Sequence, residues 1–122
     1  MRSRWKNSEW LSGPPTDIGS ARALIARVQY RDGIVHGWAY FDPELIVASA
    51  KALDAIPAEK RGPLHGVAVG VKDVIFTKDM PTQHYSPIYK DDHPRVDASV
   101  VLTLRSAGAL IFGKTHTTEF AT

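Results

Sequence analysis

Lys72 is the side chain in this sequence best suited to acid–base chemistry. It directly follows the apolar run Val67–Val71 and precedes a second apolar run at residues 74–76. A lysine held between two apolar runs is partly desolvated, which lowers its pKa toward the range that suits a general base. The end of a strand is also a usual place for a functional group in an open α/β sheet. The competing interpretation, an ion pair with Asp73 or another carboxylate or a head group in solvent, is the stronger one on residue types alone.

A second lysine, Lys114, lies in a segment with the spacing of a phosphate-binding loop. Residues Gly108–Thr115 match the pattern G-x-x-x-x-G-K-[ST]. Such a loop follows a strand and turns its backbone N–H groups toward phosphate. Here a helix is expected before Gly108, and the apolar residues 109–112 are expected to form a strand. We therefore expect Gly108 to end a helix, Gly113 to end a strand and Lys114 to be structural or on the surface. A P-loop nucleotide-binding protein remains the less favoured alternative.

The remaining residues indicate no metal site and no elbow-type nucleophile. Cysteine is absent, which excludes disulfides, thiolate metal sites and a cysteine nucleophile. No serine stands in a G-x-S-x-G pattern. We expect no metal and no cofactor, and we expect Trp38, Tyr85 and Tyr89 to pack rather than to line a pocket. The five histidines show no metal-ligand spacing: His36, His65, His84, His93 and His116.

Length and composition restrict the classes of protein to which this chain can belong. The chain has 122 residues, of which 43% are hydrophobic and 23% charged, as in one ordinary globular domain. The formal net charge of +2 provides no basic patch for nucleic acid. No apolar run is long enough for a membrane helix, and no apolar run follows the basic N-terminus as in a secretory signal. We expect a cytoplasmic protein; the three basic residues within residues 1–6 leave mitochondrial targeting as an alternative.

The elements expected before residue 61 are helical. Residues 1–15 are interpreted as a tail, and residues 16–60 as a helical lead-in. One helix is expected from about Ile18, with Thr16 or Asp17 as its N-cap, and it should fade near residues 32–33. A short strand or loop is expected at residues 34–41. Asp42, Pro43 and Glu44 then start a second helix that finishes before Pro57.

The elements expected after residue 60 alternate between strand and helix. Residues 67–71 do not alternate with polar residues and are expected to form a strand buried on both faces. A long loop at 77–96 precedes a helix that Asp97 caps, and residues 109–112 form a second buried strand. A further helix is expected to begin within residues 115–118. This order predicts an α/β fold. Two buried strands leave open sheet edges, so we expect either that more chain belongs to this fold or that a homo-oligomer covers the edges.

Three segments together resemble the N-terminal part of the amidase signature family. They are residues 62–73 (GPLHGVAVGVKD), residues 97–115 (DASVVLTLRSAGALIFGKT) and residues 117–121 (TTEFA). The resemblance covers about residues 16–122 and is specific from residue 62 onward. It implies a mixed β-sheet covered by α-helices, of which this chain holds an incomplete portion. It also explains the P-loop spacing as a coincidence of glycines at element ends.

The resemblance implies a hydrolase of non-peptide carboxylic amide C–N bonds. In the family, a neutral lysine withdraws a proton through a serine in a cis peptide, and a second serine attacks the amide carbonyl to form an acyl-enzyme. Lys72 stands in the family's Val-Gly-Val-Lys-Asp context and matches the catalytic lysine. The implied partner is a small-molecule amide, with no cofactor, no metal, no nucleic acid and no membrane. These residues do not separate simple hydrolysis from a role within a multi-subunit amidotransferase.

The match of catalytic residues stops at the lysine. The family's Gly/Ser-rich signature, with both catalytic serines, follows the segment that corresponds to residues 117–121. Ser86, Ser99 and Ser106 match neither serine. We therefore expect the isolated chain to be an inactive fragment of an amidase. The alternative from a different class is a non-catalytic, amidase-derived binding module that unfolds cooperatively by itself.

Overall fold

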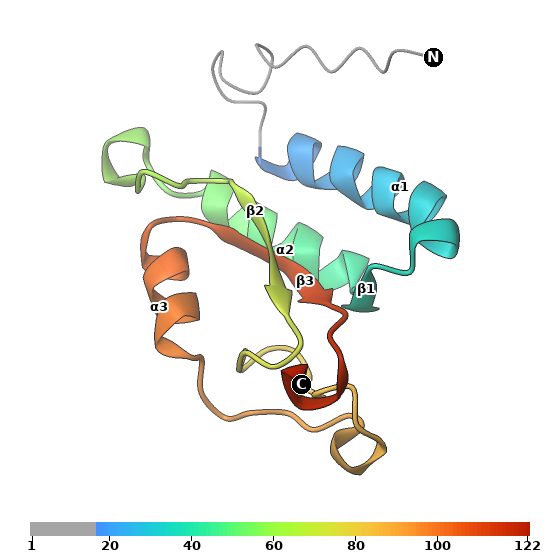
Figure 1. Ribbon diagram of the computed structural model, residues 1–122. Coiled ribbons are helices and arrows are strands. Elements are labelled where there is room, and N and C mark those ends of the chain that lie inside the picture. Colours follow the sequence, from blue (N-terminus) through green and yellow to red (C-terminus); the bar gives the residue numbers. More distant parts are fainter. Residues whose placement is uncertain (1–16) are drawn as a thin grey trace.

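The structure is a computed structural model that describes residues 17–122 (Figure 1). The tail at residues 1–15 and the N-cap candidate Thr16 lie outside the described residues. The α-helices and strands are α1 (Asp17–Val35), β1 (Trp38–Tyr40), α2 (Pro43–Asp54), β2 (Ala68–Lys72), α3 (Ser99–Ser106) and β3 (Leu110–Thr115). Short 3₁₀ turns lie at Ala58–Lys60, Pro87–Tyr89 and Glu119–Ala121. The predicted α/β class is confirmed.

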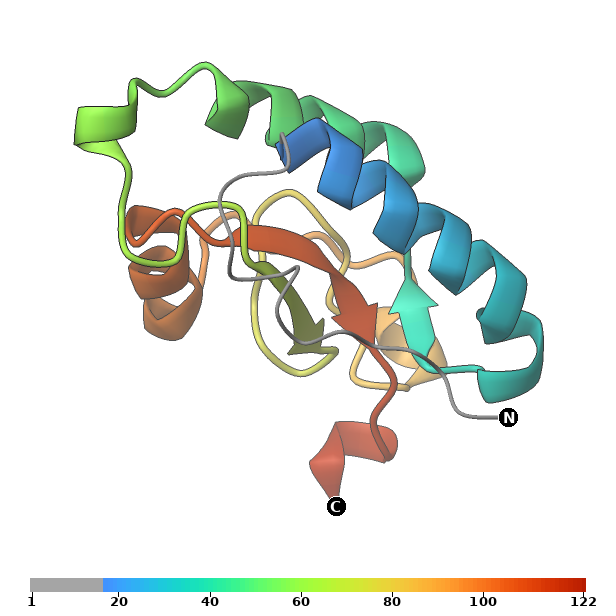
Figure 2. The ribbon, with the colours of Figure 1, turned by 90° about the horizontal axis from the view of Figure 1, so that it is seen from above.

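The three strands form one small mixed sheet with β3 in the middle. Their order is β1-β3-β2; β3 runs parallel to β2 and antiparallel to β1. Figure 2 shows α1 and α2 side by side over one face of this sheet, while α3 lies on the other side. Lys72 and Thr115 are register partners, so the carboxyl ends of β2 and β3 finish together.

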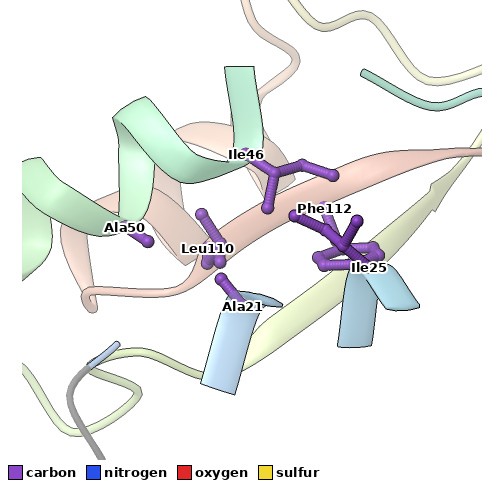
Figure 3. Packing of buried hydrophobic residues seen from close by; sticks show 6 residues of the cluster. All are labelled: Ala21, Ile25, Ile46, Ala50, Leu110 and Phe112. Atoms are coloured by element: carbon purple, nitrogen blue, oxygen red, sulfur yellow. The ribbon is translucent and has the colours of Figure 1, made fainter. Parts of the chain in front are cut away.

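Alternation along β3 divides the core between the two faces of the sheet. Leu110 and Phe112 point toward α1 and α2, whereas Ile111 packs toward α3 with Val71 and Val101. The cluster under α1 and α2 is drawn in Figure 3 and consists of Ala21, Ile25, Ile46, Ala50, Leu110 and Phe112. Trp38 and Phe41 add tilted ring contacts to Phe112 at centroid distances of 5.5 Å each.

The N-cap residue predicted for α2 is confirmed, and the one predicted for α3 is wrong. Asp42 caps α2 as predicted, because its carboxylate accepts from the Glu44 and Leu45 N–H groups at 3.0 and 3.3 Å. Asp97 does not cap α3; the N-cap is Ala98, without a side-chain hydrogen bond. The Asp97 carboxylate instead accepts from the Lys78 N–H at 2.9 Å and pairs with Arg105 at 3.1 Å. These partners hold the long loop against α3.

Several expected boundaries are wrong. Helix α1 continues to Val35 rather than fading near residues 32–33. Gly113 lies inside β3, and β3 includes Thr115, so no helix begins there; only a 3₁₀ turn follows at Glu119–Ala121. Strand β2 is not buried on both faces, because it lies at the sheet edge and only Val71 in it is buried.

Gly62 allows a close approach between the chain before β2 and the end of α3. The Leu64 N–H donates to the Ala107 carbonyl at 2.8 Å. A Cβ atom built on Gly62 would lie 2.3 Å from that same carbonyl oxygen, so backbone would have to move. The two segments can therefore lie in contact only while position 62 lacks a side chain.

Gly62→Ala is expected to lower the free energy of unfolding by about 1–3 kcal/mol through overpacking. The matched control is Gly33→Ala in α1, where an added Cβ meets nothing within 4 Å. That change should raise the free energy of unfolding by about 0.5–1 kcal/mol, because alanine loses less backbone entropy in a helix. Urea denaturation of the two variants measures both effects. Equal stability of the two variants would show that the contact at Ala107 is not tight.

Candidate functional site

Lys72 is the last residue of β2, at the edge where the parallel strands β2 and β3 end. Functional groups in open α/β sheets gather at this edge. The predicted desolvation of Lys72 is wrong for the described residues, because its strand lies at the sheet edge and the residue is exposed. The alternative of an ion pair with Asp73 is also wrong, since Asp73 is buried and pairs with Lys114. The head group of Lys72 reaches solvent.

An open cavity of about 570 Å³ adjoins the carboxyl ends of these strands. Its walls come from four places: strand β1, the residue after β2, the loop at 83–90, and the segment 116–119 after β3. Sites for small molecules are commonly concave and combine apolar walls with a few polar groups. The lining residues are Ala39, Asp73, Gln83, Tyr85, Ser86, Pro87, Lys90, His116 and Glu119.

Aromatic contacts hold two walls of the cavity together. His84 stacks on Phe120 with ring centroids 5.7 Å apart, and Tyr89 meets both rings edge-on. The Phe120 N–H donates to the His84 carbonyl at 2.9 Å. Tyr85 and His116, which both line the cavity, meet edge-on with ring centroids 6.1 Å apart. The expectation that Tyr85 only packs is therefore wrong, whereas Tyr89 does pack.

Ser86 is a cavity residue that no sequence motif singled out. The residue is 5% exposed, and its hydroxyl has no hydrogen-bond partner among the described residues. Ser99 and Ser106 lie on α3, and the Ser106 hydroxyl donates to the Leu102 carbonyl at 2.8 Å. A buried hydroxyl normally has a partner. Only the fold reveals this property of Ser86, because no local sequence pattern marks it.

Lys114 is fully buried beside the cavity wall. Its Nζ donates to the Thr82 Oγ1 at 2.7 Å and to the Pro81 carbonyl at 3.3 Å, and it lies 3.7 Å from the Asp73 Oδ1. The ammonium therefore makes two hydrogen bonds, and the Asp73 carboxylate lies within ion-pair distance of it. The expectation of a structural lysine is confirmed.

The P-loop alternative is wrong. The first glycine of the pattern follows helix α3, and residues Leu110–Thr115 are the central strand of the sheet. Strand β3 pairs with a strand on each side, so it forms no loop that cradles phosphate. The lysine of the pattern contacts residues 73, 81 and 82 instead.

Burial lowers the pKa of Lys114, and the Asp73 carboxylate opposes this lowering only in part. Between the lowered pKa and the ordinary value of 10.5, the unfolded chain binds more protons at this side chain than the folded chain does. The contribution of Lys114 to the free energy of unfolding therefore rises as the pH rises through that window.

We expect urea midpoints of the chain, measured up to about pH 9.5, to rise with pH as Lys114 loses its proton in the folded chain, and this rise should be absent from a Lys114→Met, Asp73→Asn double variant. Burial raises the pKa of Tyr40 above 10.0, with Asp42 adding to the effect. Stability from Tyr40 therefore falls only above about pH 10, outside the range measured. An identical pH profile in both proteins would contradict the lowered pKa of Lys114.

The described residues include neither a metal-ligating cluster nor a membrane-crossing helix. Among residues 17–122, no cluster of three or more histidine, aspartate or glutamate side chains has a geometry that could hold a metal ion. None of the helices in the described part of the chain combines the length and the apolar character that a membrane crossing requires.

Comparison with known proteins shows the family. The profile of the Amidase family matches residues 20–122. The protein AmiD of Mycobacterium tuberculosis is 42% identical over 108 residues, which are 87% of this chain and 23% of that protein. The matching protein of Thermobifida fusca, a subunit of glutamyl-tRNA(Gln) amidotransferase, is 40% identical over 112 residues, 90% of this chain and 22% of that protein.

Solved structures show the same fold. The native peptide amidase of Stenotrophomonas maltophilia superposes with a TM-score of 0.80 at 26% identity, over 93% of this chain and 24% of the peptide amidase. The chain therefore spans about a quarter of the length of the relatives that it matches, and it matches their N-terminal part. The family profile covers most of the residues, and the fold agrees with it. This chain belongs to the Amidase family.

Proposed function

We propose that these residues form the N-terminal part of an amidase that hydrolyses a small-molecule carboxylic amide, with Lys72 as its general base. The main support for this proposal is the position of Lys72. It ends β2 at the edge where the parallel strands finish, directly before the cavity residue Asp73, in a chain of the Amidase family. Its head group is exposed, so a partner at that edge can reach it.

The proposed chemistry follows the family relay. Neutral Lys72 accepts the proton of a bridging serine, which in turn takes the proton of a nucleophilic serine. The nucleophile attacks the amide carbonyl, and the C–N bond breaks as the proton returns to the leaving amine. Water then hydrolyses the acyl-enzyme ester, with the relay again holding the proton. Both relay serines belong to a family segment that corresponds to none of the residues 1–122.

The cavity supplies the proposed amide site with one wall. Gln83 and the unpartnered Ser86 hydroxyl offer hydrogen-bonding groups there, and Tyr85 offers an apolar face. Such a combination suits a polar amide carried on an apolar group. Lys90, Glu119 and Asp73 also line the cavity and place charges of both signs beside it. These groups support binding of a small amide, and they do not favour one amide over another.

The test begins with the reading frame that encodes residues 1–122; we call its whole product the complete protein. A frame that continues into a Gly/Ser-rich segment with two serines supports the proposal, and the complete protein should then hydrolyse aryl amides. A stop codon after Thr122 would overturn it. In that case cooperative unfolding of the chain, or a stable oligomer, would favour the non-catalytic binding module.

Residues 1–122 by themselves are expected to hydrolyse no aryl amide above background, because the base has no nucleophile to activate. The assay uses the purified chain at high concentration beside the complete protein. Hydrolysis by the isolated chain that disappears in Lys72→Ala would show that the nucleophile lies within these residues. Hydrolysis that survives Lys72→Ala would be a contaminant.

A further inference from the structure

Lys114 is a buried cation that the proposed relay does not use. It is fully buried, and an ammonium without water is expensive unless its donors are satisfied. An apolar side chain of similar length would fill the same volume without that cost. The lysine adds two hydrogen bonds and one ion pair that an apolar side chain could not make. The ion pair reaches Asp73, directly after β2, and the hydrogen bonds reach Pro81 and Thr82 in the following loop.

Asp73, the residue that follows the proposed base Lys72, is held by Lys114 and by several hydrogen bonds. The Asp73 N–H donates to the Thr115 carbonyl at 3.0 Å, and the Asp73 carbonyl accepts from the His84 N–H at 3.0 Å. Its Oδ1 accepts from the Gln83 N–H at 3.2 Å and faces Lys114 Nζ. Asp73 is thus fixed at its backbone and at its side chain, and one peptide bond separates it from Lys72.

The same contacts close the loop that forms the cavity wall. Thr82 accepts from Lys114 and donates to the Ile75 carbonyl at 3.4 Å. The two ends of the segment 73–82 therefore meet at the Lys114 ammonium. Beyond this closure the chain continues directly into the cavity residues Tyr85 and Ser86. A change in the contacts of Lys114 with Asp73 and Thr82 would therefore move both the end of β2 and the cavity wall at residues 83–90.

We propose that Lys114 is a positioning residue of the amidase site, which holds Lys72 and the cavity wall in register through Asp73 and Thr82. The inference rests on the proposed function. By the alternation of side chains along a strand, Lys72 projects to the face opposite Val71 and Asp73, so Lys114 acts on it through the backbone. Displacement of a catalytic group by about 1 Å can cost about a hundredfold in rate.

The test compares Lys114→Met with Lys78→Met in the complete protein. Methionine keeps most of the length of the side chain and removes all three donors. Lys78 lies in the same loop and is exposed, so its variant is the matched control. With rates expressed per folded molecule, Lys114→Met should lower kcat by about ten- to a hundredfold while KM changes by less than about threefold. Lys78→Met should match the wild type.

Thr82→Val is the second variant, because it removes one acceptor and leaves the charge pair in place. It should also lower kcat without raising KM, and its effect should be less than additive with that of Lys114→Met. A normal kcat per folded molecule in both variants would overturn the inference, since a purely structural lysine changes only the folded fraction. Inactivity of the unsubstituted complete protein would overturn the proposed function instead, and this inference with it.

Hydrogen exchange in residues 1–122 gives a readout that needs no amidase activity. Lys114→Met should accelerate exchange of the Asp73, Gln83 and His84 amides by at least about tenfold relative to amides in α1 and α2. Lys78→Met should leave these ratios unchanged. Exchange at residues 73–84 that accelerates no more than exchange in α1 and α2 would show that Lys114 does not hold this closure.

Discussion

Lys72→Ala in the complete protein is expected to lower kcat/KM for an aryl amide by about 10²–10⁴-fold, the usual contribution of a general base. The free energy of unfolding should change by less than about 0.5 kcal/mol, because Lys72 is exposed at the end of an edge strand. Large loss of activity with unchanged stability separates a chemical role from a structural one. Steady-state kinetics and urea denaturation of the same preparation measure the two quantities.

Lys72→Arg sharpens this test. Arginine retains the positive charge and most of the length, but it does not lose its proton in proteins. An arginine therefore cannot act as the neutral base, and we expect it to be about as inactive as alanine. Lys60→Ala, at an exposed position in the turn Ala58–Lys60, should keep full activity. Substantial activity in Lys72→Arg would mean that position 72 needs a charge and not a base.

Lys114→Met is expected to lower the free energy of unfolding by about 3–5 kcal/mol, the usual penalty for removing one partner of a buried ion pair. The pair lies in the interior, with side-chain exposures of 0% for Lys114 and 3% for Asp73. The lysine is lost, but the Asp73 carboxylate stays buried, with the Gln83 N–H as its remaining side-chain partner. The destabilisation therefore comes mainly from the unpaired carboxylate.

The double variant Lys114→Met, Asp73→Asn tests whether the unpaired Asp73 carboxylate causes this loss of stability. Asparagine keeps an oxygen for the Gln83 N–H and removes the charge, so the double variant should recover most of the lost stability. Calorimetry or urea denaturation of the two single variants and the double variant completes the cycle. Strictly additive losses in the double variant would rule out the unpaired carboxylate as the cause.

The sequence predicted the family and the position of Lys72 because both depend on contiguous segments. The motif around Lys72 and the capped start of α2 are local, and the structure places them as expected. The end of α3 at Ser106 also agrees with the expected stop at Gly108. Features of this kind involve neighbours within a few residues, which a linear pattern contains.

The features that the sequence did not predict depend on distant partners. The burial of Lys114 depends on Thr82, 32 residues earlier, folding back over it. Asp97 was expected to cap α3 because local rules favour it, but the Arg105 guanidinium and the Lys78 N–H compete for its carboxylate. Strand β1 has three residues and no alternation in burial, so only its pairing with β3 defines it.

The central position of β3 has a consequence for the order of folding. The strand that joins the sheet together is the last of the three described strands to be synthesised, and within residues 17–122 β1 and β2 each pair only with it. During translation α1 and α2 can meet first, but their shared apolar face stays uncovered until Leu110 and Phe112 arrive. Pairings between segments far apart in sequence form slowly, and exposed strand edges and apolar faces favour aggregation meanwhile. Within residues 17–122, this apolar face and these strand edges therefore stay open to aggregation from the completion of α2 until β3 emerges from the ribosome.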